Sequence, residues 1–166
     1  MKPCRVLFVC TGNICRSPTA DGLLRHVIAQ RGWSGRVVSD SAGTHGYHVG
    51  HAPDPRTIDV AAKYGVALEA LRARRVDITD FNDFDFVLAM DRGHLDSLLA
   101  QRPADCSACV QLFSDFYAQP DAGLPDGIPD PYYGGPDGFE QVYRFIENGV
   151  SGLVKVIEKE YLTSVS

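Results

Sequence analysis

Cys10, Arg16 and Ser17 are the residues whose types and spacing point most directly to chemistry. Cys10 follows the apolar run Val6–Val9, and five residues separate it from Arg16. A cysteine thiolate is a nucleophile, and a guanidinium presents a planar fork of donors that matches two oxygens of a phosphate. The spacing therefore predicts a nucleophile beside an arginine that binds an anion.

The segment between Cys10 and Ser17 is predicted to be a loop that holds this anion. Val6–Val9 is short and wholly apolar, as is typical of a strand buried on both faces. Ser17-Pro18 is typical of a helix start, with Ser17 as N-cap and Pro18 in the first helical position. Backbone N–H groups of residues 11–17 can then converge on one centre beside the positive end of the helix. The same surroundings favour the thiolate form of Cys10.

Strand and helix patterns alternate along the rest of the chain. The predicted strands are residues 6–9, 36–40, 84–90 and 109–113, and the predicted helices are residues 18–31, 55–64, 92–100 and 139–162. Asp54-Pro55 predicts the start of the second helix, with Asp54 as its cap and Pro55 in the first turn. Gly149 and Gly152 are expected to bend or loosen the last helix. Such alternation predicts a parallel sheet with right-handed crossovers and helices on both faces. Sites in these sheets lie beyond the carboxyl ends of the strands, where Cys10 is placed.

Residues 119–138 contain five prolines, so no regular element is predicted there. Long loops in compact domains are often functional, and this one can carry the carboxylate of Asp130 over the site. The same description fits four other aspartates, namely Asp115, Asp121, Asp126 and Asp137. The residues by themselves do not select one of the five.

Length, charge and cysteine content limit the class of protein. A chain of 166 residues fits one domain, predicted to span residues 1–166. The formal net charge of −5 offers no basic excess for nucleic acid or an anionic membrane, so an anion site must be built locally. No membrane span or signal peptide is recognisable. We therefore expect a cytoplasmic protein whose five cysteines are reduced.

Several alternatives can be weighed on the residues. The loop lacks both G-x-x-x-x-G-K-[ST] and G-x-G-x-x-G, which excludes the common nucleotide-binding loops. An ordinary buried cysteine explains Cys10 alone, but not its coincidence with Gly12, Arg16 and the helix start that follows. His48 and His51 have H-x-x-H spacing without further ligands for zinc, so we expect them to be solvated. No metal or cofactor is predicted.

The stretch Cys10-Thr-Gly-Asn-Ile-Cys-Arg-Ser-Pro18 closely resembles the signature loop of the low-molecular-weight protein tyrosine phosphatases. The resemblance extends to Asp40–Thr44, Ala89–Asp91 and Asp130–Gly134, and so covers nearly the whole chain. It implies a three-layer α/β/α fold whose central four-stranded parallel sheet has the order 2-1-3-4. It also implies hydrolysis of phosphotyrosine and small aryl phosphates through a cysteinyl-phosphate.

The resemblance further implies roles for single residues. Cys10 is the nucleophile, Arg16 is the phosphate clamp, and Asp130 is the general acid that protonates the leaving phenol and then acts as a base toward water. The phosphate-binding loop comprises Thr11, Gly12, Asn13, Ile14, Cys15, Arg16 and Ser17.

Support for the loop is implied in the same way. Ser17 donates a hydrogen bond to the nucleophile, and Asn13 takes the left-handed conformation that asparagine tolerates, supported by Ser41. Leu71 stands where many members carry a histidine that also supports this asparagine. We therefore expect activity to be retained with an altered pH dependence.

The walls of the site are expected to select the substrate. Tyr47, Tyr132 and Tyr133 are candidates for an aromatic slot that accepts a phenyl phosphate. Ile14 matches the tyrosine-phosphatase type of loop, whereas related arginine phosphatases carry threonine there. The resemblance implies tyrosine-phosphorylated proteins as substrates and a tyrosine kinase as a candidate partner, and we expect a monomer.

The other cysteines leave two questions open. Cys15 is either a small residue facing the core or a redox backup that traps oxidised Cys10 as a reversible disulfide, as the equivalent cysteine does in relatives. Cys106 and Cys109 form a C-x-x-C pair, which keeps open an arsenate reductase of the same fold that relays electrons by disulfide exchange with Cys10. An inert phosphotyrosine-binding module is expected to lack the nucleophile or the acid, and both residues are present.

Overall fold

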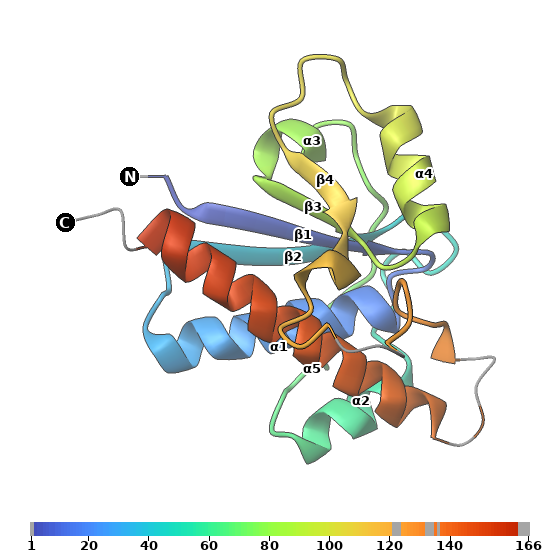
Figure 1. The fold of residues 1–166 in the computed structure, drawn as a ribbon. Helices are drawn as coiled ribbons and strands as arrows, with labels where there is room; N and C mark the ends of the chain where they lie inside the picture. The colour runs from blue at the N-terminus through green and yellow to red at the C-terminus, as the bar shows by residue number, and fades with distance from the viewer. Residues whose placement is uncertain (1, 121–123, 132–134, 136, 163–166) are drawn as a thin grey trace.

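A parallel sheet forms the centre of the protein. The computed structural model describes residues 2–120, 124–131, 135 and 137–162. The sheet that it places there has four strands in the order β2-β1-β3-β4, all parallel (Figure 1). The strands are β1 (Cys4–Cys10), β2 (Val37–Gly43), β3 (Phe86–Ala89) and β4 (Cys109–Leu112). The predicted order and parallel direction are confirmed.

The central strand β1 is buried because both of its faces carry apolar side chains. Val6 and Phe8 belong to one apolar cluster, and Leu7 and Val9 belong to another. All four side chains are fully buried. This is the pattern expected of an inner strand covered by helices on both sides.

Helices cover the two faces of the sheet. Those described are α1 (Arg16–Arg31), α2 (Pro55–Lys63), α3 (Asp80–Asp83), α4 (Arg92–Gln101) and α5 (Gly138–Ile157), with shorter turns η1 (Phe113–Phe116) and η3 (Glu158–Leu162). The elements α1, α2 and α5 contribute to the cluster around Phe8, whereas α3 and α4 contribute to the cluster around Leu7 (Figure 1). The three-layer arrangement is confirmed.

The start of α1 differs from the prediction. The helix begins at Arg16, and Cys15 rather than Ser17 occupies the N-cap position without a side-chain cap. The Ser17 hydroxyl instead contacts the Cys10 sulfur at 2.9 Å. Ser17 is therefore not the cap that its sequence context suggested, because its side chain is directed into the loop. Asp54 does cap α2 as predicted, accepting from the Arg56 N–H.

Other boundaries also shift. Strand β2 extends to Gly43, beyond the predicted end at residue 40, because it pairs with β1 as far as Cys10. The short helix α3 was not predicted, since four residues give no periodic signal. The predicted helix 139–162 is α5 followed by a π-helical turn, η3.

The two glycines of α5 allow close packing against η1. A methyl group at Gly149 would overlap the Phe113 ring, and one at Gly152 would overlap the Phe116 carbonyl oxygen. Both partners belong to η1, which follows β4. The absence of a side chain therefore lets α5 lie directly against η1.

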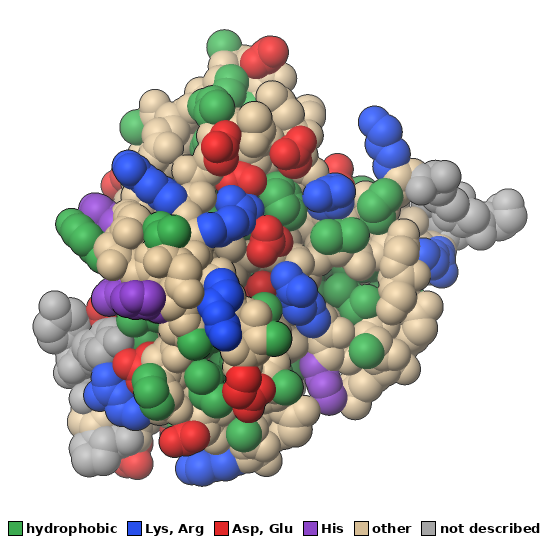
Figure 2. Space-filling view, turned by 180° about the vertical axis from the view of Figure 1, so that it is seen from behind, with side chains coloured by type: hydrophobic (Ala, Val, Ile, Leu, Met, Phe, Trp, Pro, Cys, Tyr) green, Lys and Arg blue, Asp and Glu red, His purple; other side chains and the backbone are tan. Residues whose placement is uncertain are grey.

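Two further features are the distribution of charge on the surface and the length of the apolar helices. On the face seen in Figure 2, acidic and basic side chains are interspersed, without a large area of one sign. No helix within the described part of the chain is long and apolar enough to cross a membrane.

We predict that Gly152→Ala lowers the free energy of unfolding. Alanine normally stabilises a helix interior by about 1 kcal/mol relative to glycine. Here the overlap involves the backbone of Phe116, so we expect a net loss of about 1–3 kcal/mol, measured by urea denaturation. The exposed neighbour gives a matched control, since Ser151→Ala should change stability by less than about 0.5 kcal/mol. An alanine variant as stable as the parent would contradict this packing.

Candidate active site

The loop between β1 and α1 lies at the carboxyl end of the central strand. Its carbonyl groups are taken by neighbouring segments: the Cys10 and Thr11 carbonyls accept from the backbone of residues 44 and 45, and the Ile14 carbonyl accepts from Asp54. Within the described structure, the N–H groups of residues 11–14 have no acceptor. The loop therefore keeps several backbone donors available next to a helix start, which is the arrangement that binds anions.

Asn13 holds this loop in its shape. Its φ of 59° lies in the left-handed region, and its side chain is buried. The Asn13 amide donates to the hydroxyls of Ser17 (2.8 Å) and Ser41 (2.9 Å), and its oxygen accepts from the Arg74 backbone N–H (3.0 Å). Leu71 packs against the apolar core. The side-chain oxygen of Asn13 thus accepts a hydrogen bond from a backbone N–H, although Leu71 stands at the position of the histidine expected from the resemblance.

Arg74 is itself anchored by two carboxylates. Its guanidinium pairs with Asp40 at 3.1 Å and with Asp80 at 3.0 Å. Burial alone would lower the pKa of Arg74, but its hydrogen bond to Asp80 and the charge of Asp40 outweigh that effect and raise it. The segment that supports Asn13 is therefore fixed by ion pairs as well as by its backbone.

Hydrogen-bond geometry assigns the Ser17 proton. Because the Ser17 oxygen accepts from Asn13, its own proton is free to point elsewhere. The Cys10 sulfur lies 2.9 Å away, and the Ala42 carbonyl oxygen lies at 3.5 Å. The shorter contact favours donation to Cys10, which stabilises negative charge on sulfur.

Arg16 is buried beside the loop and is held by residues outside it. One guanidinium nitrogen donates to the Asp91 carboxylate (2.9 Å) and to the Ile128 carbonyl (3.1 Å). Burial favours a higher pKa for Asp91, but the His94 backbone N–H and the charge of Arg16 hold it below the ordinary value. Asp91 therefore remains an anion that orients Arg16.

One pocket of about 130 Å³ brings the predicted residues together. Its lining comprises Cys10, Thr11, Gly12, Ile14, Cys15, Arg16, Tyr47, His48 and Asp130. Asp130 also lines an adjoining groove with Thr11, Arg16 and Asp91. Of the four candidate aspartates that the structure describes, only Asp130 lines the pocket at Cys10. Asp121 lies outside the described residues.

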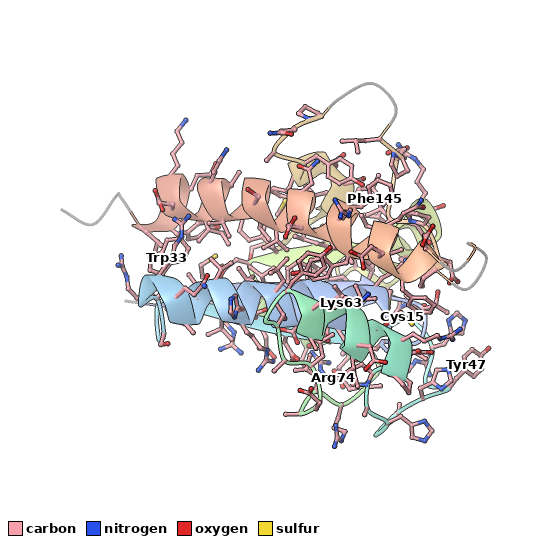
Figure 3. All side chains as sticks on the ribbon, turned by 90° about the horizontal axis from the view of Figure 1, so that it is seen from below. Cys15, Trp33, Tyr47, Lys63, Arg74 and Phe145 are labelled. Carbon is pink, nitrogen blue, oxygen red and sulfur yellow. The ribbon has the colours of Figure 1, made fainter. Side chains whose placement is uncertain are left out.

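Of the three tyrosines predicted to contact the substrate ring, the structure describes only Tyr47. Tyr47 is 74% exposed and stacks on the His45 ring, with centroids 5.1 Å apart, and it projects from the same end of the molecule as Cys15 (Figure 3). Tyr132 and Tyr133 lie outside the described residues.

Two groups at the site were not found from the sequence. His48 is half-buried and lines the pocket, contrary to the solvated position expected for it. Its ring lies over Gly12, where a methyl group would meet it at 2.8 Å. His94, buried on α4, faces Asp91. Neither residue carries a signal in its local pattern, because only the fold brings these segments to the loop.

The C-x-x-C pair lies far from Cys10. Cys109 begins β4 and is level with Phe86, which pairs with Val6 of β1. Cys10 is four residues further along β1, or about 13 Å at the usual rise per residue. Burial also raises the pKa of the Cys109 thiol, which opposes its use as a nucleophile. No group of three metal-binding side chains occurs among the described residues.

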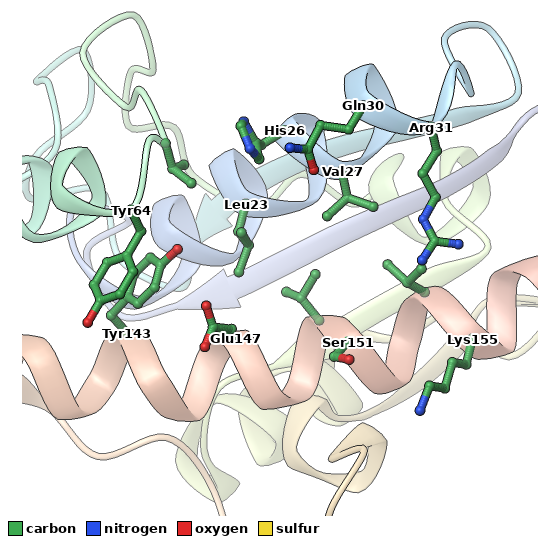
Figure 4. A pocket seen from close by; sticks show the side chains of 13 residues that line it. Leu23, His26, Val27, Gln30, Arg31, Tyr64, Tyr143, Glu147, Ser151 and Lys155 are labelled. Atoms are coloured by element: carbon green, nitrogen blue, oxygen red, sulfur yellow. The ribbon is translucent and has the colours of Figure 1, made fainter.

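A larger cavity of about 390 Å³ lies elsewhere, between α1 and α5 (Figure 4). Leu23 and Val27 of α1 line one side, Tyr64 and Tyr143 stack at one end with centroids 4.3 Å apart, and Glu147 lines the side formed by α5. This cavity shares no lining residue with the pocket at Cys10. It contains no cysteine, so its size does not make it a second site for the same chemistry.

Known sequences match this chain along almost its full length. The family model for low molecular weight phosphotyrosine protein phosphatase matches residues 5–163. The low molecular weight phosphotyrosine protein phosphatase of Schizosaccharomyces pombe is 43% identical over 86% of this chain and 89% of its own. The low molecular weight protein-tyrosine-phosphatase YfkJ of Bacillus subtilis is 37% identical over 93% of this chain and 96% of its own.

A solved structure matches the fold equally well. The protein tyrosine phosphatase of Entamoeba histolytica, crystallised with Hepes in its active site, superposes with a TM-score of 0.87 at 34% identity, covering 96% of this chain and 99% of that one. With the sequence matches and the loop at Cys10, this similarity identifies the chain as a member of the low molecular weight phosphotyrosine protein phosphatase family.

Proposed function

We propose that this protein is a phosphoric monoester hydrolase that removes phosphate from phosphotyrosine and from small aryl phosphates. The observation that carries the proposal is a single pocket lined by Cys10, Arg16 and Asp130, next to N–H groups of residues 11–14 that have no acceptor among the described residues. A nucleophile, a clamp and an acid are the groups that such a reaction needs. Family membership supports the same reaction.

In the first proposed step, the Cys10 thiolate attacks phosphorus. The S–P bond forms as the P–O bond to the phenol breaks, and Asp130 gives its proton to the departing oxygen. Charge on the three equatorial oxygens is stabilised by Arg16 and by the N–H groups of residues 11–14. These donors are already in place, so little reorganisation is needed during the reaction.

In the second proposed step, water hydrolyses the cysteinyl-phosphate. Asp130, now a carboxylate, accepts a proton from the attacking water, and the S–P bond breaks to release phosphate. The leaving group is the Cys10 thiolate, which receives the hydrogen bond from Ser17. Ser17 therefore assists both the start and the end of the cycle.

The substrate is proposed to be a tyrosine-phosphorylated protein. Tyr47 at the rim, together with Tyr132 and Tyr133, would contact the phenyl ring. Ile14 in the pocket matches the tyrosine-specific type of loop. The proposed unit is one domain over residues 1–166 that acts as a cytoplasmic monomer, with a tyrosine kinase as candidate partner.

The separation between Cys10 and Cys109 disfavours the arsenate reductase alternative. A disulfide relay requires thiols that come within bonding distance. Cys109 lies about 13 Å along the sheet from Cys10. The sulfur of Cys106 donates to the Phe81 carbonyl in the second apolar cluster.

We predict that Cys10→Ser abolishes hydrolysis of aryl phosphates and that Asp130→Ala lowers kcat by about 10²–10⁴-fold. Loss of a general acid should matter most for poor leaving groups. The Asp130→Ala defect is therefore expected to be larger with phenyl phosphate than with p-nitrophenyl phosphate, as measured by steady-state kinetics.

Asp115→Ala provides the matched control, because Asp115 is exposed on η1 and lines none of the pockets described. This variant should keep the parent rate on both substrates. Full activity in Cys10→Ser, or an Asp130→Ala defect that is independent of the leaving group, would overturn the mechanism.

We also propose that Cys15 protects the nucleophile from oxidation. Peroxide converts the Cys10 thiolate to a sulfenic acid and releases hydroxide. The Cys15 thiol then attacks that sulfur to form a disulfide with loss of water. Cys15 is buried and lines the same pocket as Cys10, which supports this proposal.

Recovery from peroxide tests this role. Cys15→Ser should lose most of its activity irreversibly, whereas the parent and Cys106→Ser should recover when treated with dithiothreitol. Equal recovery in all three proteins would contradict a protective role for Cys15.

A further inference from the structure

A partly buried chain of polar contacts joins two parts of the phosphate loop through α4. The Thr11 hydroxyl lies 2.6 Å from Nε2 of His94. Nδ1 of His94 lies 3.1 Å from one Asp91 oxygen, and the other Asp91 oxygen lies 2.9 Å from Arg16. His94 is only 5% exposed. The imidazole thus connects the first residue after Cys10 to the carboxylate that orients Arg16.

The neighbours of the imidazole determine where its protons lie. Asp91 is an anion beside Nδ1, which favours the tautomer that carries its proton on Nδ1. Nε2 then has a lone pair and must accept the hydrogen bond, so Thr11 donates. Nδ1 makes no hydrogen bond of good geometry to any described residue, so the Asp91 oxygen at 3.1 Å acts on it through its charge. The proton arrangement is therefore set by Asp91 and Thr11 together.

The surrounding charges keep this imidazole neutral. Burial lowers the pKa of His94 to about 4, and the nearby positive charge of Arg16 acts in the same direction. His45 adds a smaller lowering effect, whereas Asp91 and Asp130 oppose it. At neutral pH His94 is therefore a hydrogen-bond acceptor toward Thr11 and adds no cation beside Arg16.

The Asp91 carboxylate is held from two directions. One oxygen accepts from the His94 backbone N–H at 3.0 Å and lies against the imidazole, and the other faces Arg16. Without the imidazole, the carboxylate loses its neighbour on the side away from Arg16, and Thr11 loses its acceptor. Both changes loosen groups that line the pocket.

We propose that His94 is a positioning residue of the phosphatase, which fixes the Thr11 hydroxyl and the Asp91–Arg16 pair in one arrangement. The proposal rests on the proposed function, because Arg16 is the phosphate clamp there. His94 does not touch the reacting atoms in this scheme. It acts through Thr11 and Asp91.

Nitrogen NMR of the imidazole tests the arrangement without any substrate. At pH 7 the His94 ring should carry its proton on Nδ1, and it should titrate near pH 4, well below the ordinary histidine value of about 6.5. Thr11→Val should shift the Nε2 resonance, and Thr11→Ser should restore it. A proton on Nε2, or titration near pH 6.5, would overturn the proposal.

Two conservative variants test the functional consequence. His94→Gln can place its amide near the Nε2 position and so keeps a partner for Thr11, whereas the shorter side chain of His94→Asn reaches only the Nδ1 position. We expect kcat/KM for p-nitrophenyl phosphate to fall about tenfold in His94→Asn, as for one lost hydrogen bond, with most of it recovered in His94→Gln. His26→Asn, on α1 at the second cavity, should keep the parent value.

A double variant separates positioning from general damage to the fold. If His94 acts partly through Thr11, His94→Asn should have a smaller effect in the Thr11→Val background than in the parent. Equal effects in both backgrounds, or asparagine and glutamine variants that match the parent, would overturn the proposal. An inactive parent would instead overturn the proposed function, and the NMR result would then decide on the arrangement alone.

Discussion

Asn13 turns the chain through a left-handed conformation between β1 and α1, and its buried side chain holds that turn in place. The turn depends on hydroxyls from α1 and β2 and on the backbone of Arg74. Because a non-glycine residue is strained in this conformation, these three contacts must offset the cost. Once the turn is fixed, the N–H groups of residues 11–14 find no acceptor in the described part of the chain, and the Ser17 hydroxyl lies against the Cys10 sulfur.

This local geometry resolves a conflict between the overall charge of the protein and its proposed substrate. The net charge of −5 repels phosphate at long range. Backbone donors, the helix start and buried Arg16 provide positive potential only within the pocket. Asp91 lies beside Arg16 and reduces that potential, so its contribution is orientation of the guanidinium.

Much of the fold could be predicted because β1 and several helices have recognisable patterns in residues that are adjacent in the sequence. Val6–Val9 indicated a strand buried on both faces, and Asp54-Pro55 indicated the start of α2. The prediction of Ser17 as an N-cap is wrong. The Ser17 hydroxyl contacts the Cys10 sulfur instead, and this contact forms only when the loop folds. His48 and His94 could not be predicted as neighbours of the loop, since residues distant along the chain become adjacent only through the sheet order. The position of Asp130 in the pocket, which none of the other described candidate aspartates lines, depends on the same information.

In the proposed reaction, this loop presents Cys10 to phosphorus, and a covalent cysteinyl-phosphate forms. Rapid acid quenching of the protein during turnover of p-nitrophenyl phosphate, followed by peptide mass spectrometry, tests it most directly. The account predicts a peptide containing Cys10 that carries one phosphoryl group and disappears as substrate is exhausted. Turnover without a phosphorylated peptide, or with the phosphoryl group on another residue, would contradict it.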